Sequence, residues 1–294
     1  MNLSERRGLV ETDWLQEHLD EPELRVVECT SLIPNYFEPS AADGLILESG
    51  RKDWEQGHIP KSAFADFLDD LSDRSNERLM YAMPSAEQFS TAMSKLGVGE
   101  GTAVVLYDRQ ANMWASRLWW MLRAFGFDNA AVLNGGWIKW TAEGRTVSTE
   151  AANYPRAQFF PKPRPELIAG REQVRAAIGN EKAGLVNALD PDEFAGKPPH
   201  RYPRSGRIPS SVNVPFFMAA DPETQVFASD DELKKQFDAC GATDKDEVIC
   251  YCGGGIAACN IALALTRLGV DNVSVYDGSM TEWAADSSLP LEVG

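Results

Sequence analysis

The chain has 294 residues, 44% of them hydrophobic and 24% charged, which is an ordinary globular composition for one large or two average domains. Its 28 basic and 44 acidic residues give a net charge of −16, which argues against nucleic acid or an anionic membrane as a partner. No apolar run approaches the ~20 residues of a membrane span and no hydrophobic stretch follows the N-terminal arginines, so we expect a cytoplasmic protein.

The first half of the chain has the pattern of an α/β unit. A short apolar strand is predicted at Arg25–Val27, and a Gly57–Pro60 turn follows it. An apolar β-branched run from Val104 leads through a polar turn at Asp108 into a stretch of helical period. A second strand and the segment Gly136–Trp140 complete this unit.

The second half repeats the same order of segments. Each segment of the first half has a counterpart here, in the same order. The counterparts are the strand Gly184–Val186, the turn Gly206–Pro209, the strand from Val248, the turn at Cys252 and the segment Ser279–Trp283. The offset is 144 residues at the strand (104 to 248) and 143 at the end (140 to 283), so the first copy has one extra residue in its turn. An internal repeat of this length indicates two similar domains.

A proline-rich segment separates the two copies. Residues 151–166 contain prolines at 161, 163 and 165, an alternation that excludes a helix and favours an extended linker. We therefore predict domains at 1–150 and 167–294. The alternation of strands and helices predicts, in each domain, a parallel sheet with helices on both faces. In such sheets ligands bind beyond the carboxyl ends of the strands, which singles out the turns at Asp108 and Cys252.

The turn at Cys252 can support chemistry. Cys252 ends the predicted strand, three glycines follow, and a helix is expected to run to about Leu268. The first amides of a helix lack intrahelical partners and carry about half a positive charge, and glycines can turn further amides inward to bind an anion. A cysteine at this position is favoured as a thiolate nucleophile. Asp108 occupies the same place in the first copy, so we predict that domain one is catalytically inactive and walls the cleft between the domains.

These residues resemble the tandem-rhodanese sulfurtransferases, the family that includes thiosulfate and 3-mercaptopyruvate sulfurtransferases. The similarity covers nearly the whole chain and rests on Arg117–Met121, Val132–Gly136 with Trp140, Ser211–Phe216 and the Cys252 loop. The resemblance implies that Cys252 forms a persulfide in a ping-pong cycle. The implied cradle consists of the backbone amides of Gly253, Gly254, Gly255, Ile256 and Ala257.

The resemblance also implies the substrates. The donor would be a small anion such as thiosulfate or 3-mercaptopyruvate, and the acceptor a thiol, for example on a thioredoxin-like protein, or cyanide. No metal or organic cofactor is implied. Five cysteines, an odd number, do not suggest a disulfide framework.

Three departures from the family pattern concern the donor. The loop has Gly253 and Gly254 where the family carries Arg-Lys or Gly-Ser, and Leu189 stands where the family has a donor-binding arginine. A basic cluster follows, and we hypothesise that Arg204, and less directly Arg201, replace the missing arginine; a solvated basic loop is the alternative. Asp73 resembles an acidic residue near the site of mercaptopyruvate enzymes, although a loop aspartate that makes turn hydrogen bonds is the favoured interpretation.

The same residues are less compatible with other functions. Cysteine phosphatases, and normally arsenate reductases, have an arginine six positions after the cysteine, where this chain has Ala258. A non-catalytic rhodanese-like binding or regulatory module is the alternative function; the loss of the donor arginine supports it, and the retained Cys252 is the best evidence against it. A metal site is disfavoured because Cys250 and Cys259 supply no recognisable ligand set. Cys29 and Cys240 are predicted as buried, and Arg117 is expected to satisfy a buried carboxylate or carbonyl.

Overall fold

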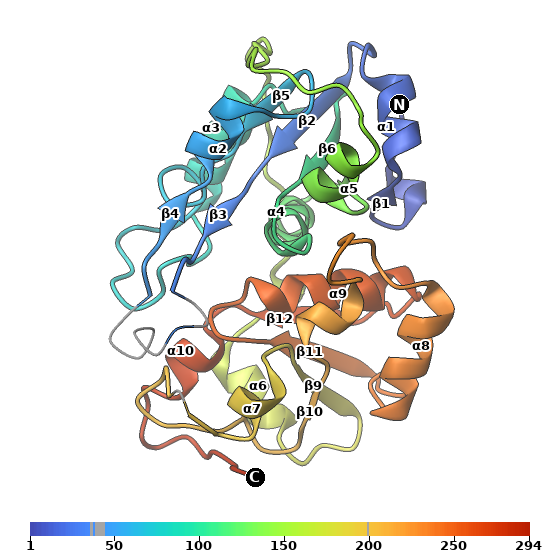
Figure 1. Cartoon of the computed structure of the whole chain (residues 1–294). Helices are drawn as coiled ribbons and strands as arrows, with labels where there is room; N and C mark the ends of the chain where they lie inside the picture. Colours follow the sequence, from blue (N-terminus) through green and yellow to red (C-terminus); the bar gives the residue numbers. More distant parts are fainter. Residues whose placement is uncertain (36–37, 39–44, 199) are drawn as a thin grey trace.

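Two parallel five-stranded sheets, one in each half of the chain, organise the structure. The computed structural model describes residues 1–35, 38, 45–198 and 200–294. The first sheet has the strand order β1-β7-β6-β2-β5 and the second the order β10-β9-β11-β12-β8, and every pairing within them is parallel. Helices flank both sheets (Figure 1). The predicted fold class is confirmed, and the sheets divide at the predicted linker, although the domain bounds themselves stay a prediction.

The elements follow the order expected from the repeat. In the first half they are β1 (Leu9–Val10), α1 (Thr12–His18), β2 (Leu24–Glu28), β3 (Ser31–Leu32), β4 (Glu48–Ser49), α2 (Arg51–Gln56), β5 (Ser62–Phe64), α3 (Ala86–Lys95), β6 (Ala103–Tyr107), α4 (Met113–Ala124), β7 (Ala130–Leu133) and α5 (Gly136–Ala142). In the second half they are β8 (Ile168–Ala169), α6 (Arg171–Ala177), β9 (Ala183–Asn187), α7 (Pro191–Phe194), β10 (Ser211–Asn213), α8 (Asp230–Ala239), β11 (Glu247–Tyr251), α9 (Ala257–Arg267), β12 (Val273–Tyr276) and α10 (Ser279–Trp283). Short 3-10 turns lie at Ser4–Arg6, Pro165–Leu167 and Phe216–Ala219.

The central strands are buried on both faces. All five residues of β2, β6 and β9 are buried, as are four of the five in β11. Parallel sheets covered on both sides select such continuous apolar runs in place of alternating ones. This burial fixes the register of each strand, and so it fixes where the residue after each strand emerges.

One helix from each domain lies in the contact between the two domains. α4 packs against α9, and both helices are buried over most of their length (Figure 1). The Ser116 hydroxyl donates to Asn260 Oδ1 across this interface at 3.1 Å, and Trp119 and Trp120 lie in the core as predicted. Because α9 begins at the Cys252 loop, the first domain supports the helix that carries the candidate site.

The linker is extended but is not a free spacer. Its backbone has no regular structure before Pro165, as predicted. However, Phe159 is buried and its carbonyl accepts from Ser90, while the amides of Lys162 and Arg164 donate to the last carbonyls of the α4 region. The linker therefore packs along the first domain.

Candidate active site

Strand β11 delivers Cys252 to the carboxyl edge of the second sheet. β11 lies between β9 and β12, and Cys252 is the first residue beyond it. Residues 253–256 then connect to α9 without regular structure. Cys252 is only 3% exposed. Cys252 is therefore buried in the structure, with only a small part of its surface open to a reactant.

Ser279 fastens the loop from below. Its Oγ accepts from the amides of Cys252 (3.0 Å) and Gly255 (3.1 Å) and donates to the carbonyl of Tyr276 (2.7 Å). Ser279 has a positive φ of 46°, an unusual conformation for a residue with a side chain. The Gly255 amide is thus committed to Ser279, so the prediction that it belongs to the cradle is wrong.

The neighbouring peptide planes are oriented by α10. The Cys252 carbonyl accepts from the Met280 amide at 3.0 Å, and the Gly253 carbonyl accepts from the amide (2.9 Å) and hydroxyl (2.8 Å) of Thr281. In a trans peptide the N–H points opposite to the C=O, so the amides of Gly253 and Gly254 point away from α10.

Several amides of the loop are left without an acceptor. In the part of the chain that the structure describes, no backbone or side-chain oxygen accepts from the amides of Gly253, Gly254, Ile256 or Ala257. Ala257 begins α9, where the dipole of the helix adds to the positive potential. The loop therefore presents the unsatisfied donors that an anion beside Cys252 requires.

Arg117 of the first domain supports the loop from the other side. Its guanidinium donates to the Gly255 carbonyl (3.3 Å), to Asp277 Oδ1 (2.5 Å) and to the Tyr81 carbonyl (3.0 Å). The second oxygen of Asp277 accepts from the Met83 amide at 2.9 Å. The expectation that Arg117 satisfies a buried carboxylate and carbonyls is confirmed, and the contact joins the two domains at the loop.

The first domain contains a filled version of the same turn. Asp108 is fully buried, and its carboxylate accepts from the amides of Gln110 (2.7 Å), Asn112 (3.1 Å) and Ala115 (2.8 Å). Burial raises the pKa of Asp108 to about 7, and the amide hydrogen bonds oppose the rise. The Asp108 carbonyl accepts from the Trp137 amide at 3.0 Å, as the Cys252 carbonyl does from its own partner. This turn binds a carboxyl group through backbone amides.

The other cysteines differ from Cys252 in their surroundings. The Cys259 thiol donates to the Gly255 carbonyl at 3.1 Å, and burial raises its pKa to about 12. Burial likewise raises the pKa of Cys250 and Cys29, which are fully buried. Cys240 is half-buried, so its predicted burial is only partly right. Among the described residues all five cysteines are free and no cluster could hold a metal ion.

The basic cluster does not supply a free donor-binding arginine. Arg204 donates to the backbone carbonyls of Ala284 (3.0 Å), Leu289 (2.8 Å), Trp283 (3.0 Å) and Asp286. These carbonyls lie at and beyond the end of α10, so Arg204 closes that segment and the hypothesis that it replaces the lost arginine is wrong.

Arg201 and Asp73 are also engaged. Arg201 forms an ion pair with Glu193 at 2.8 Å, and both side chains are about nine-tenths buried. Asp73 Oδ1 accepts from the amide (2.9 Å) and hydroxyl (2.6 Å) of Ser75, and these bonds lower its pKa. Asp73 thus makes the turn interactions that were the alternative for this residue.

Tyr202 was not predicted, yet it lies over the loop. A Cβ placed on Gly253 would come within 2.5 Å of the Tyr202 hydroxyl and 3.9 Å of Leu189. By contrast, a Cβ on Gly254 would meet no atom closer than 4.0 Å. The sequence predicts a role for the arginines on either side of Tyr202, and no pattern in the sequence distinguishes the phenol from an ordinary loop tyrosine. Ser279 was noted only as part of the repeat.

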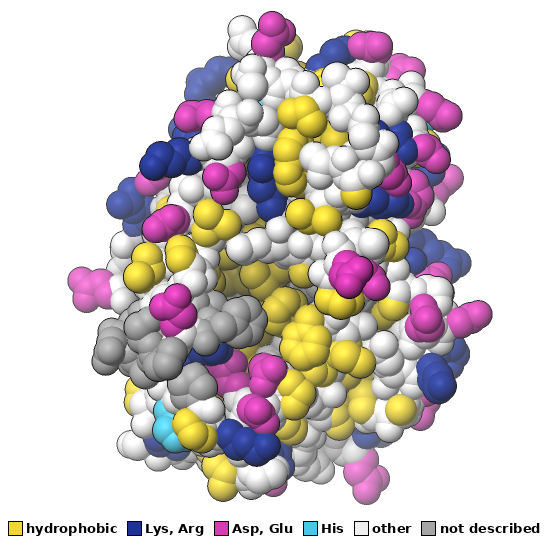
Figure 2. Space-filling model, viewed as in Figure 1, with side chains coloured by type: hydrophobic (Ala, Val, Ile, Leu, Met, Phe, Trp, Pro, Cys, Tyr) yellow, Lys and Arg dark blue, Asp and Glu magenta, His cyan; other side chains and the backbone are white. Residues whose placement is uncertain are grey.

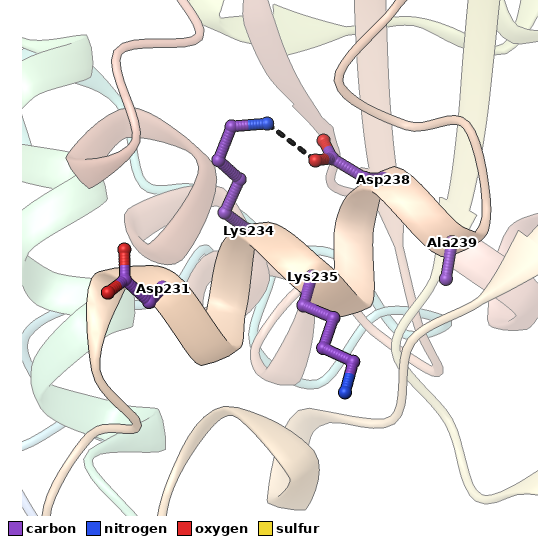
Figure 3. Close-up of a pocket in the computed structure, with 5 residues that line it drawn as sticks. All are labelled: Asp231, Lys234, Lys235, Asp238 and Ala239. Carbon is purple, nitrogen blue, oxygen red and sulfur yellow. Dashed lines mark hydrogen bonds and ion pairs between the residues drawn. The ribbon is translucent and has the colours of Figure 1, made fainter.

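Two hollows of the surface are lined by residues other than those of the Cys252 loop. One, of about 580 Å³, is open to solvent along α8, where Lys234 and Asp238 form an ion pair at 2.5 Å (Figure 3). Another, of about 360 Å³, is lined from both domains, by Asn76 and Leu79 on one side and Glu282 on the other. On the face shown in Figure 2, hydrophobic side chains gather in a hollow between the two domains. No described helix is long and apolar enough to cross a membrane.

Comparisons with known proteins place the chain in a family. The model of the rhodanese-like domain matches residues 11–143 and 171–286. The chain is 31% identical to 3-mercaptopyruvate sulfurtransferase of Escherichia coli over 96% of its length and 97% of that protein. It is 32% identical to thiosulfate/3-mercaptopyruvate sulfurtransferase 2 of Arabidopsis thaliana, covering 98% of this chain and 87% of that one. The crystal structure of SseA, a 3-mercaptopyruvate sulfurtransferase from E. coli, superposes with a TM-score of 0.80 at 29% identity, over 92% of this chain and 98% of that one. The chain therefore belongs to the rhodanese family, in the two-domain form that it shares with these sulfurtransferases.

Proposed function

We propose that the protein transfers a sulfane sulfur through a persulfide on Cys252. The observation that carries the proposal is a cysteine placed between a buried strand and a helix N-terminus, beside the unsatisfied amides of Gly253, Gly254, Ile256 and Ala257. These donors would hold the negative charge that a thiolate, a persulfide and the transferring sulfur share. Asp108 supports the idea, because the equivalent turn already holds a carboxyl group by its amides.

The reaction consists of two displacements at sulfur. The Cys252 thiolate attacks the sulfane sulfur of the donor, a new S–S bond forms, and the donor's remaining part leaves with the electron pair of the broken bond. An acceptor nucleophile then attacks the outer sulfur of the persulfide, and Cys252 leaves as a thiolate. A single nucleophile serves both halves, as ping-pong chemistry requires.

The donor is a small anion bound mainly by the backbone. Loop positions 253 and 254 carry no side chain, Leu189 is apolar, and Arg201 and Arg204 already have carboxylate and carbonyl partners. Thiosulfate and 3-mercaptopyruvate are the two donors proposed, since relatives of this length are named for both. Because these two arginines already have other partners, we expect a higher KM for either donor than a site with a donor-binding arginine gives.

The acceptor is a thiol or cyanide. A relative from Thermus thermophilus, 32% identical over 97% of this chain, is named sulfur carrier protein TtuD, which supports including a protein thiol such as that of a thioredoxin-like partner. The proposed location remains the cytoplasm, where such thiols are kept reduced.

Intact-mass spectrometry tests the proposal. The protein is incubated separately with thiosulfate, 3-mercaptopyruvate and inorganic polysulfide, and then with cyanide. We expect a gain of one sulfur atom that is located on Cys252 by peptide mapping and removed by cyanide as thiocyanate. Cys252→Ser should abolish the gain, and Cys259→Ser, a change in a buried thiol of the same domain, should retain it. A sulfur adduct that persists in Cys252→Ser, or no adduct from any donor, contradicts the proposal.

A further inference from the structure

A phenol lies where the loop itself has no polar side chain. The Tyr202 hydroxyl lies against Gly253, the residue directly after Cys252. The space beside it, above Gly254, is open, since a Cβ there would have its nearest neighbour at 4.0 Å. Tyr202 is half-buried and its ring packs against the hydrophobic core, which fixes the direction of the hydroxyl.

A buried carboxylate stands behind this phenol. Glu193, on the short helix α7, pairs with Arg201 at 2.8 Å, and their side chains are 10% and 9% exposed. Burial raises the pKa of Glu193, while the neighbouring Arg201 cation and Tyr202 hydroxyl oppose the rise. A carboxylate adjacent to a phenol gives that phenol a place to pass its proton.

Sulfur acceptors differ in whether they need to lose a proton. A free thiol, with a pKa near ~8.5, is mostly protonated at neutral pH, and only its thiolate attacks a persulfide effectively. The loop carries glycine at 253 and 254 and offers no side-chain hydroxyl or base for this step. The Thr281 hydroxyl also contacts Gly253, but it is committed to the Gly253 carbonyl, whereas the Tyr202 hydroxyl lies on the side where a Cβ of Gly253 would point.

We propose that Tyr202 is the catalytic residue that deprotonates a thiol acceptor above the Cys252 loop, with Glu193 as the positioning residue that receives the phenol proton. This inference rests on the proposed persulfide of Cys252. The acceptor S–H proton passes to the Tyr202 oxygen as the Tyr202 proton passes to Glu193. The acceptor thiolate attacks the outer sulfur of the anionic persulfide, the S–S bond breaks, Cys252 leaves as a thiolate among the loop amides, and the transferred sulfur keeps its negative charge on the acceptor. The product is the acceptor persulfide, and no redox co-reactant is needed.

The test separates acceptors that need deprotonation from one that does not. The enzyme is first loaded with inorganic polysulfide, which avoids any dependence on donor preference, and loading is verified by mass. Discharge of the persulfide is then timed with glutathione and, separately, with sulfite at a pH where sulfite is the dianion. Tyr202→Phe should slow discharge to glutathione by about 10²-fold, the lower end of general acid–base effects, and leave discharge to sulfite within about twofold. Glu193→Gln should slow the glutathione reaction in the same direction.

Tyr154→Phe is the matched control. Tyr154 uses its hydroxyl between the Lys61 carbonyl and the Val26 amide in the first domain, so its loss should change neither rate. Equal slowing with both acceptors would mean that Tyr202 only shapes the loop, and no slowing with glutathione would mean that it takes no part; either outcome overturns the inference. Failure of the wild-type protein to load sulfur on Cys252 would instead contradict the proposed function.

Discussion

Removing the Ser279 hydroxyl should loosen the Cys252 loop without touching any reacting atom. Ser279 Oγ is the acceptor for two buried amides of the loop and the donor to the Tyr276 carbonyl. Its backbone has a φ of 46°, where the first domain has Gly136 at 49°. Ser279→Gly therefore removes the side-chain hydrogen bonds and also the cost of the positive φ, because glycine adopts this backbone conformation readily. Ser279→Ala removes the same hydrogen bonds but keeps the backbone strain.

The expected cost follows from the groups left unpaired. Each buried amide without an acceptor costs about 1–3 kcal/mol, and water entering at the edge of the loop recovers part of this. We expect a loss of about 2–4 kcal/mol in the free energy of unfolding for Ser279→Ala. Ser279→Gly should be about 1 kcal/mol more stable than Ser279→Ala, because glycine has no Cβ to strain at positive φ. The rate of persulfide formation should fall about 10²-fold in both variants, since an anchor of the nucleophile has been lost.

Urea unfolding and single-turnover sulfur loading measure these two effects. Ser274→Ala, on β12 of the same domain, is the matched control, because the Ser274 hydroxyl is buried and has no hydrogen-bond partner among the described residues. That variant should be as stable as the wild type or slightly more so. If Ser279→Gly had the same free energy of unfolding and the same rate of persulfide formation as the wild type, the claim that Ser279 holds the loop would be refuted.

Three further changes test other contacts. Arg204→Ala should lower the unfolding free energy by about 2–4 kcal/mol, because it frees several carbonyls, and should leave the donor KM unchanged; a large rise in KM would restore its substrate role. Gly253→Ala should lower the free energy of unfolding by about 1–3 kcal/mol, because the new Cβ would lie 2.5 Å from the Tyr202 hydroxyl. Adding Tyr202→Phe to Gly253→Ala should restore most of this loss, and Gly254→Ala alone should have little effect. Urea melts of the three variants measure these differences. Burial raises the Cys259 pKa to about 12 in the folded protein, so the unfolded chain loses this proton at lower pH and the free energy of unfolding should fall as the pH rises from about 9 toward 12. Urea melts at about pH 8 and about pH 10 should show a smaller fall in Cys259→Ala than in the wild type. A fall of the same size in both proteins would contradict the assignment to Cys259.

The repeat made the fold readable from the sequence. Two copies of a strand, a turn and an apolar helix predict two parallel sheets, and the structure has them with strands β6 and β11 in equivalent places. A continuous apolar run is enough to predict a strand that is buried on both faces, and this pattern can be recognised within a few residues of sequence. The position of Cys252 at the end of β11 follows from the same local pattern.

The contacts around the loop could not be predicted in the same way. Ser279 is 27 residues from Cys252 and 24 from Gly255, and the residues between them form a helix and a strand whose packing sets the contact. Arg204 shows the converse error. A basic residue in a predicted loop suggested an anion site, but the guanidinium donates to backbone carbonyls that only the folded end of α10 brings together.

The two equivalent turns show how a protein of net charge −16 can present hydrogen-bond donors to a negatively charged group. In the first domain the carboxyl group of Asp108 fills the concavity of amides, and in the second the thiol of Cys252 stands beside a concavity whose donors are unsatisfied. Backbone donors are fixed by the fold, so their local field acts at contact distance, where the screened charge of the distant surface has little effect. We expect a site built in this way to hold charge on sulfur without a guanidinium, so that its selectivity among donors and acceptors depends on uncharged side chains beside the loop, such as Tyr202.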